Sequence, residues 1–267
     1  RRAGRVPVFV MLQPAGDGDM SAQPEVLEFR RNLRATGIRP VVAHDCYLVN
    51  LAAPSPAMWR RSLAAFEDEL VRAEQLGIPY LVTHPGSHAG AGEAAGIARV
   101  AEALNRVGAG GRRVRVLLEV TAGQGTSLGY RFEHLAAILA RVERGEHLGV
   151  CLDTCHLLAA GYDIRTPEGY RDTLRALQAC LGLRRVQAIH LNDSQAGLGS
   201  RVDRHAHIGE GALGLRAFGF FLRDPRLRRV PMILETPKDG DAVRADRRNL
   251  ARLRRLVNGG RGMETAR

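Results

Sequence analysis

The sequence predicts an α/β fold with parallel strands, closed as a (β/α)8 barrel. Short apolar runs alternate with longer amphipathic runs along the whole chain, which is typical of strands joined by helical crossovers. Six of the seven apolar runs end in a residue that can bind a metal, at intervals of 34 to 45 residues. No linker interrupts the pattern. An open doubly wound sheet is the alternative, but it would concentrate its ligands at one switch point.

The expected elements follow from this alternation. Strands are predicted at 6–12, 38–44, 80–84, 114–120, 148–154, 186–191 and 230–235, and helices at 24–36, 55–75, 93–107, 131–142, 167–181, 213–222 and 242–257. Ser55 as N-cap, Pro56 after it and Gly77 past the end mark the second helix. Since a barrel needs eight strands, we expect the first strand–helix unit to be missing or replaced at the N-terminus. We expect residues 1–257 to form a single domain and 258–267 a disordered tail.

Composition restricts the class of partner. The chain has 267 residues, of which 45% are hydrophobic, and a formal net charge of +11. A chain of this length and composition can build a core of ordinary size, and the positive charge suits an anionic partner such as nucleic acid. The four cysteines form no CxxC pair, so we expect reduced thiols in an intracellular protein. No apolar run or leader pattern predicts a membrane partner.

The strand ends carry the first candidate site residues. In a barrel the carboxyl ends of all strands converge on one face, and that face holds the active site. Imidazole and carboxylate groups delivered there can bind metal ions. The predicted strand-end ligands are His44, His84, Glu119, Asp153, His190 and Glu235.

Loops add three more candidates. His156 follows the strand that ends at Asp153, and a glycine-rich loop after His190 supplies Asp203 and His205. Two residues apart in an extended segment, Asp203 and His205 point to the same side. Five histidines and four carboxylates suit two or three zinc ions if a carboxylate bridges. Three Zn²⁺ would outweigh the four carboxylates, and such a site favours a phosphate.

Several longer runs resemble the endonuclease IV family of apurinic/apyrimidinic (AP) endonucleases. They are His84-Pro-Gly-Ser-His88, Glu119-Val-Thr-Ala-Gly-Gln-Gly125, Val150-Cys-Leu-Asp-Thr-Cys-His156, His190-Leu-Asn-Asp193, Gly199-Ser-Arg-Val-Asp-Arg-His205 and Ile233-Leu-Glu-Thr236. The resemblance covers residues 41–236. It implies a TIM barrel with three zinc ions that cuts DNA 5′ to an abasic site in base excision repair and leaves a 3′-OH. It also implies 3′-repair phosphodiesterase or phosphatase activity.

The resemblance also implies a ligand assignment. His44, His84 and Glu119 hold one zinc, and Glu119 bridges to a second that is held by Asp153, His190 and Glu235. The third zinc takes His156, Asp203 and His205, and Mn²⁺ can replace zinc at one position. Glu119, Asp153 and Glu235 are the catalytic carboxylates, which hold and orient the nucleophile.

DNA contacts are expected from two sets of loop residues. By resemblance, Tyr47 and Leu48 wedge into the duplex where the abasic sugar is flipped out; the alternative is that they pack under the next helix. Gln124, Arg201 and Arg204 are the other expected DNA contacts, with solvated surface arginines as the alternative for the last two. The expected partner is double-stranded DNA with abasic or blocked 3′ ends. We expect a monomer, cytoplasmic and associated with the nucleoid of a prokaryote.

Two departures from the family motifs bear on function. Pro14 stands where the family has a lesion-probing arginine, and Val120 replaces an asparagine, which we expect to loosen the support of Glu119. Two other functions stay open. A sugar isomerase or epimerase on a related barrel would need only one or two metals and no His156, Asp203 and His205 set. A non-catalytic DNA-binding relative with impaired lesion recognition is the other.

Overall fold

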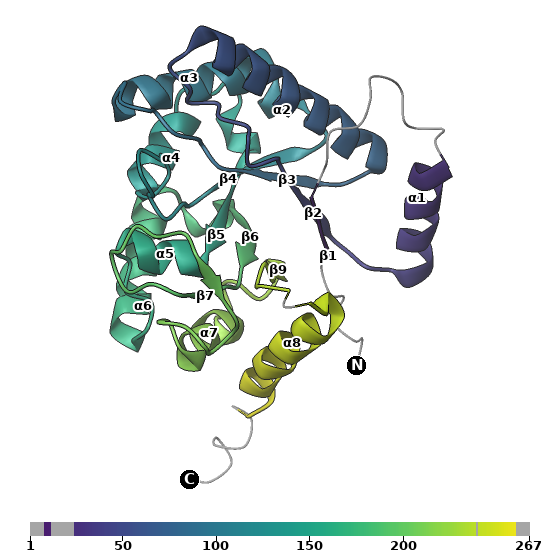
Figure 1. Ribbon diagram of the computed structural model, residues 1–267, viewed down its shortest axis with the longest axis vertical. Coiled ribbons are helices and arrows are strands. Elements are labelled where there is room, and N and C mark those ends of the chain that lie inside the picture. Colours follow the sequence, from purple (N-terminus) through teal and green to yellow (C-terminus); the bar gives the residue numbers. More distant parts are fainter. Residues whose placement is uncertain (1–7, 12–23, 239, 260–267) are drawn as a thin grey trace. The chain divides into compact units, whose positions relative to one another are not determined.

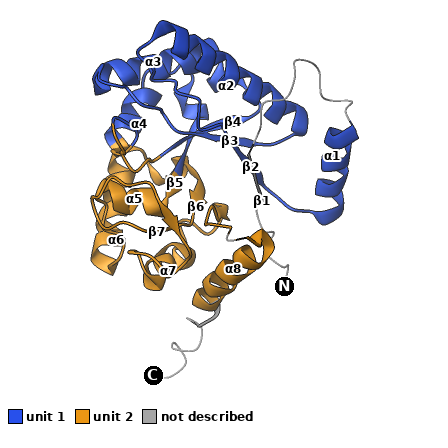
Figure 2. Ribbon diagram, in the orientation of Figure 1, with its two compact units in different colours: residues 1–119, 126–129, 133–151 blue, residues 120–125, 130–132, 152–267 orange. Residues whose placement is uncertain are grey.

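The computed structural model describes residues 8–11, 24–238 and 240–259. Each of the seven predicted strands corresponds to an observed strand, and parallel strands alternate with helices along the chain (Figure 1). The chain divides into two compact units (Figure 2): residues 1–119, 126–129 and 133–151 form the first, and residues 120–125, 130–132 and 152–267 the second. Within the described residues, no helix combines the length and apolar character that crossing a membrane requires.

The first unit is a parallel sheet with helical connections. Its strands are hydrogen bonded in the order β1-β2-β3-β4-β5, where β5 contributes its first three residues to this unit. The strands are β1 (Val8–Met11), β2 (Val41–His44), β3 (Tyr80–Thr83), β4 (Arg115–Glu119) and β5 (Gly149–Asp153). The helices are α1 (Pro24–Thr36), α2 (Pro56–Leu76), α3 (Glu93–Arg106) and α4 (Phe132–Leu139), of which the first residue, Phe132, belongs to the second unit.

Strands β2 to β5 are buried along almost their whole length. All five residues of β5 and four of the five residues of β4 are buried, as expected for parallel strands covered on both faces. The register pairs His44 with Val82 and Thr83 with Leu118. The ends of β2, β3 and β4 therefore lie at similar heights, and this brings His44, His84 and Glu119 to the same edge.

Helix ends follow the expected local chemistry. The Ser55 side chain accepts a hydrogen bond from the Met58 backbone N–H, and Pro56 opens α2. Gly77 ends the helix with φ 73°, a left-handed conformation that glycine adopts without a steric cost. The predicted boundaries of this helix are confirmed to within one residue.

The second unit contains the remaining elements. Its helices are α5 (Thr154–Ala160), α6 (Pro167–Cys180), α7 (Leu215–Arg223) and α8 (Ala242–Gly259). Its strands are β6 (Val186–His190), β7 (Asp193–Ser194), β8 (His205–Ala206) and β9 (Met232–Ile233). β6 pairs with β9 in parallel, with His190 opposite Ile233, and β7 pairs with β8 antiparallel, with Ser194 opposite His205.

Several local predictions were wrong. The last strand is only Met232–Ile233 rather than 230–235, and α5 and the β7–β8 pair were not predicted. β2 starts at Val41 rather than 38, because Pro40 has no N–H to donate to a neighbouring strand. α8 ends at Gly259, two residues into the predicted tail; residues 260–267, like Pro14, lie outside the described residues.

Candidate metal centre

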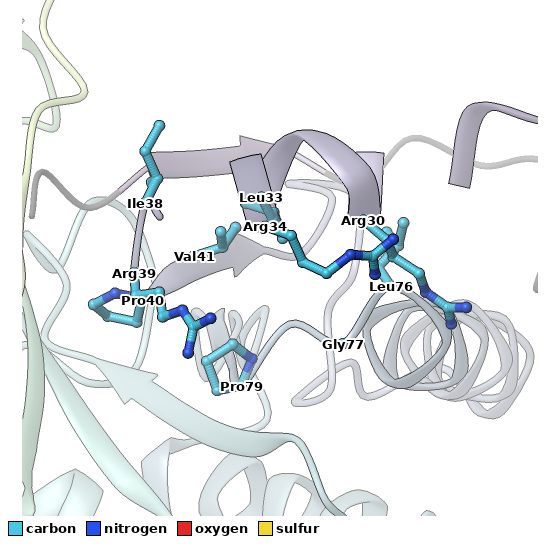
Figure 3. Close-up of a pocket in the computed structure, with 10 residues that line it drawn as sticks. All are labelled: Arg30, Leu33, Arg34, Ile38, Arg39, Pro40, Val41, Leu76, Gly77 and Pro79. Carbon is cyan, nitrogen blue, oxygen red and sulfur yellow. The ribbon is translucent and has the colours of Figure 1, made fainter. Parts of the chain in front are cut away.

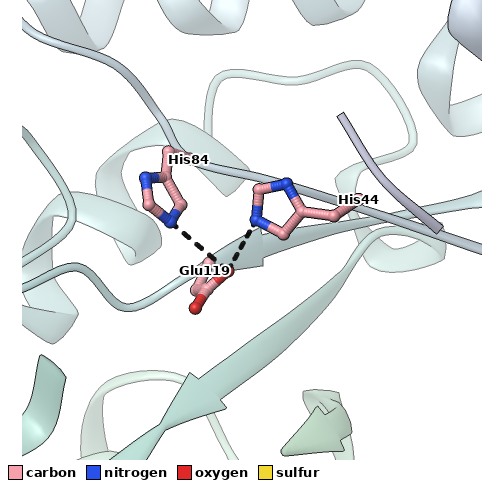
Figure 4. Close-up of side chains that lie close together, drawn as sticks. All are labelled: His44, His84 and Glu119. Atoms are coloured by element: carbon pink, nitrogen blue, oxygen red, sulfur yellow. Dashed lines mark hydrogen bonds and ion pairs between the residues drawn. The ribbon is translucent and has the colours of Figure 1, made fainter. Parts of the chain in front are cut away.

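His44, His84 and Glu119 form a cluster in the first unit (Figure 4). Both imidazoles approach the same carboxylate oxygen: Glu119 Oε2 is 3.1 Å from His44 Nε2 and 3.5 Å from His84 Nε2. The potential ligand atoms of the three residues lie within 4.8 Å of one another. Glu119 is fully buried, and a buried carboxylate needs a charged or hydrogen-bonding partner. This group can hold one metal ion.

The orientation of His44 is set by its neighbour. Its Nδ1 is 2.8 Å from the Asp45 carbonyl oxygen, which directs Nε2 toward Glu119. The Asp45 carboxylate in turn accepts a hydrogen bond from the Thr83 hydroxyl at 2.5 Å. Burial lowers the pKa of His44, but hydrogen bonds to Asp45 and Glu119 outweigh it and hold that pKa well above 6.5. The ring is thus strongly attracted to the negative charge around it.

A second group, in the second unit, consists of Asp153, His190 and Glu235. His190 Nδ1 lies 2.9 Å from Glu235 Oε2 and 3.9 Å from Asp153 Oδ2. Asp153 and His190 are both fully buried. Asn192, which sequence reasoning missed, fastens the two carboxylates: its Nδ2 donates to Asp153 Oδ2 at 2.6 Å and to Glu235 Oε2 at 3.4 Å. Its Oδ1 accepts from the Glu235 backbone N–H at 2.9 Å.

Asp153 has a second role as the N-cap of α5. Its Oδ1 accepts the His156 backbone N–H at 2.8 Å, as a carboxylate at a helix N-cap commonly does. The strand-end residue therefore fixes the first turn of the helix that carries His156. The sequence signal for α5 was present, because Asp153 precedes an apolar run that ends at Gly161.

His156, Asp203 and His205 form a third group, also in the second unit. Asp203 Oδ1 lies 3.1 Å from His156 Nε2 and 3.5 Å from His205 Nε2. His205 Nε2 is also 3.8 Å from Asp153 Oδ2. Potential ligand atoms of Cys155, Asp203 and His205 lie within 4.8 Å of one another as well; the sequence analysis treated Cys155 only as a reduced thiol.

Three of the five histidines share one feature. Each has Nδ1 beside a backbone carbonyl oxygen and Nε2 facing a carboxylate: His44 uses Asp45 O, His156 uses Val120 O at 2.9 Å and His205 uses Glu235 O at 3.2 Å. Histidines that bind metals typically have the second ring nitrogen fixed in this way. Val120, noted as a departure from the family motif, contributes its backbone oxygen and has a buried side chain.

The Tyr47 and Leu48 side chains are exposed, at 86% and 72% of their full accessible surface. They do not pack under the next helix, which was the alternative expectation. The Cys46 backbone N–H donates to both carboxylate oxygens of Glu69 on α2, at 3.1 and 3.3 Å, and the Val49 N–H donates to the Cys46 carbonyl. Burial raises the pKa of Glu69 to about 7. Hydrogen bonds to Glu69 therefore fix the backbone of this loop, and the Tyr47 and Leu48 side chains extend from it into solvent.

The other three predicted DNA contacts are exposed residues of the second unit. Gln124 Oε1 accepts the Asp203 backbone N–H at 3.0 Å. The Arg201 guanidinium lies over the Tyr130 ring, 4.4 Å from its centroid. Arg204 donates to the Asp203 carbonyl at 2.8 Å. All three therefore adjoin the segment that carries Asp203.

A cavity of about 420 Å³ in the first unit contains none of the predicted site residues (Figure 3). It is mostly apolar, and its lining includes Arg30, Arg34 and Arg39. This cavity is therefore separate from the residues that the sequence analysis predicted for the site.

Comparison with known proteins agrees with this geometry. Residues 8–256 match the family model described as xylose isomerase-like TIM barrel. The chain is 58% identical over 238 residues to a protein of Chloroflexus aurantiacus named probable endonuclease 4, covering 88% of this chain and 83% of that protein. Its structure matches endonuclease IV from Thermus thermophilus with a TM-score of 0.80 and 35% identity, covering 96% of this chain and 99% of the other.

A D-tagatose 3-epimerase-like protein also matches, with a TM-score of 0.70, 17% identity and coverage of 95% of this chain and 90% of that protein. At that identity the match shows only the shared fold. The predicted TIM-barrel fold class is confirmed. The chain belongs to the endonuclease IV family of the xylose isomerase-like TIM barrels.

Proposed function

We propose that this chain is a zinc-dependent AP endonuclease that hydrolyses the DNA phosphodiester 5′ to an abasic site and leaves a 3′-OH. The observation that carries the proposal is the group formed by His156, Asp203 and His205. It supplements the two groups built at the strand ends and gives the chain a third set of ligands. A 3′-repair phosphodiesterase or phosphatase activity of the same site is part of the proposal.

The donor sets fit zinc. Each group offers imidazole nitrogens and carboxylate oxygens, which zinc binds in catalytic sites that keep a position open for water or substrate. The carbonyl contacts to Nδ1 of His44, His156 and His205 fix the rings in the orientation a ligand needs. Manganese at one of the three positions is compatible with the same nitrogen and oxygen donors.

Bound zinc ions would supply the Lewis acidity that makes a hydroxide nucleophile available at neutral pH and offsets charge on the phosphate. The chain supplies the positioning. Glu119, Asp153 and Glu235 are the carboxylates that would hold the ions and orient the nucleophile. Asn192 restricts the rotation of the Asp153 and Glu235 carboxylates by bonding to both. Arg204, next to Asp203, is the residue we assign to a backbone phosphate of the DNA.

A sugar isomerase or epimerase is the other function compatible with the fold. One or two metals suffice for that chemistry, so the His156–Asp203–His205 group would have no role. A DNA-binding protein without activity would need none of the three ligand groups. The presence of three ligand groups therefore favours phosphodiester hydrolysis. The finer expectations of a monomer that acts in the cytoplasm on chromosomal DNA stay predictions.

Incision of a defined duplex tests the proposal. The zinc-loaded protein is incubated with a labelled duplex that contains one abasic site, with the same duplex lacking the lesion, and with a ketose. We expect a single cut 5′ to the lesion that leaves an extendable 3′-OH, and no epimerised sugar. Ketose epimerisation without incision would instead identify a sugar enzyme, and duplex binding without incision a non-catalytic relative.

We also propose that Tyr47 and Leu48 enter the duplex at the lesion. Apolar side chains of this kind can wedge between base steps, and these two extend from a loop whose backbone Glu69 holds. Replacing both by Ala should lower kcat/KM on abasic duplex roughly 30-fold, equivalent to about 2 kcal/mol. Zinc content should not change.

The matched control is Val243→Ala, which shortens an exposed apolar side chain on α8 (59% exposed). It should keep the wild-type kcat/KM in the same steady-state assay. If the double variant matches this control, Tyr47 and Leu48 do not contact the lesion.

A further inference from the structure

Gln124 occupies an unusual position between two loops of the second unit. It lies in the glycine-rich segment 121–125, and its side-chain oxygen accepts the backbone N–H of Asp203, 79 positions further along the chain, at 3.0 Å. Asp203 is the residue whose carboxylate approaches both His156 and His205. The amide oxygen of Gln124 is thus bonded to the backbone of a candidate ligand.

The loop that carries Gln124 is fixed by close packing. Gly123 has φ +78°, and a Cβ added there would lie 2.8 Å from Cβ and Cγ of Tyr130. Only glycine permits this approach without a shift of the backbone or ring. The backbone on the N-terminal side of Gln124 is therefore seated directly on the Tyr130 side chain.

The loop that carries Asp203 is restrained at several points. Its Gly199 and Arg201 N–H groups donate to the Leu158 and Ala159 carbonyls of α5, at 2.9 and 3.0 Å. Arg201 has φ +56°, which is costly for a residue with a side chain, and its guanidinium stacks on Tyr130. On the far side of Asp203, the Gln195 N–H donates to the Arg204 carbonyl at 2.9 Å.

Between the restrained residues Arg201 and Arg204, the backbone N–H of Asp203 is hydrogen bonded to the Gln124 side chain. Asp203 is not buried, with its side chain 36% exposed, so the packing of a core does not fix its orientation. Small rotations of the Asp203 backbone would move its carboxylate away from His156 and His205, whose rings are held by carbonyl contacts. Within this group Asp203 is the most exposed of the three ligands, since His156 and His205 are 2% and 20% exposed, and it is the one that Gln124 supports.

We infer that Gln124 is a positioning residue for the third zinc, acting through the backbone of Asp203. This inference rests on the proposed function, because it presumes a metal ion at His156, Asp203 and His205. Loss of such a supporting hydrogen bond typically weakens metal binding by about 10- to 100-fold. The role needs only the acceptor oxygen of Gln124, whereas a contact with DNA phosphates would need its NH₂ group.

Zinc retention by the DNA-free protein tests the inference. The zinc-loaded full chain is equilibrated with increasing concentrations of a chromophoric chelator, and the zinc that remains bound is counted by elemental analysis. Gln124→Met removes the acceptor at similar side-chain length, and Gln124→Glu keeps an acceptor oxygen but removes the NH₂ group. We expect Gln124→Met to release one zinc at a chelator concentration about 10- to 100-fold lower than the wild type requires. Gln124→Glu should retain zinc as the wild type does.

Gln178→Met is the matched control. Gln178 is an exposed α6 residue whose Oε1 accepts the Leu183 backbone N–H at 3.0 Å, the same kind of contact without a candidate ligand. It should retain zinc as the wild type does. If Gln124→Met also retains zinc while the wild type incises abasic DNA, the positioning role is wrong and the proposed function stands. If the wild type binds no zinc, the proposed function itself fails.

Discussion

Glu119→Gln is expected to lower the single-turnover rate of incision of an abasic duplex by about 10³-fold or more. The Glu119 carboxylate is fully buried, and its Oε2 atom lies close to Nε2 of both His44 and His84. An amide of the same size has no charge, and rotation of its NH₂ group toward the imidazoles would remove a ligand. A loss of about 10³-fold corresponds to about 4 kcal/mol, within the several kcal/mol that a metal ion contributes to stabilising transition-state charge.

The control for this variant is Glu102→Gln. Glu102 lies on α3 with its side chain 52% exposed, in an ion pair with Arg106. The neutral variant should incise at the wild-type rate because exposed ion pairs contribute little to stability. If the incision rate of Glu119→Gln is within about tenfold of the rate of this control, Glu119 is not a metal ligand.

Removal of the metal ions is expected to abolish incision and to lower the melting temperature by on the order of 10 °C for each ion removed. The buried carboxylates of Glu119 and Asp153 would lose their counter-charges, and buried charges are costly to leave uncompensated. A ligand present at about 1,000 times its Kd stabilises the fold by about 4 kcal/mol per site, and each kcal/mol raises the Tm of a domain of this size by about 2–4 °C.

Differential scanning calorimetry before and after dialysis against a chelator measures this shift. Added Zn²⁺ should restore both the Tm and the incision. Added Mg²⁺ should not, because it prefers six oxygen ligands in near-octahedral geometry. Full activity in excess chelator would contradict a role for metals.

The strand ends were the part of the site most accessible to sequence reasoning. A parallel sheet delivers the carboxyl ends of its strands to one edge, so the spacing of His44, His84 and Glu119 predicted the cluster that the structure contains. The same logic predicted that His190 and Glu235 lie together. It failed on the length of β9, because apolar residues at 230–235 carry no signal for where strand pairing stops.

Contacts between loops far apart in sequence could not be predicted in this way. The Gln124–Asp203 bond, the Asn192 contacts and the use of the Val120 carbonyl by His156 depend on side-chain orientation in folded loops. No periodicity records such contacts. The exposure of Tyr47 and Leu48 agrees with the resemblance, but the hydrogen bonds from the loop backbone to Glu69 could not be predicted from the sequence.

Titration of the metal-free protein with zinc, with incision of abasic duplex and bound zinc measured in each sample, tests the central claim most directly. We predict that activity is fully recovered only as bound zinc approaches three ions per chain. Full incision with one bound zinc, or with none, would contradict a zinc ion at each of the three ligand groups.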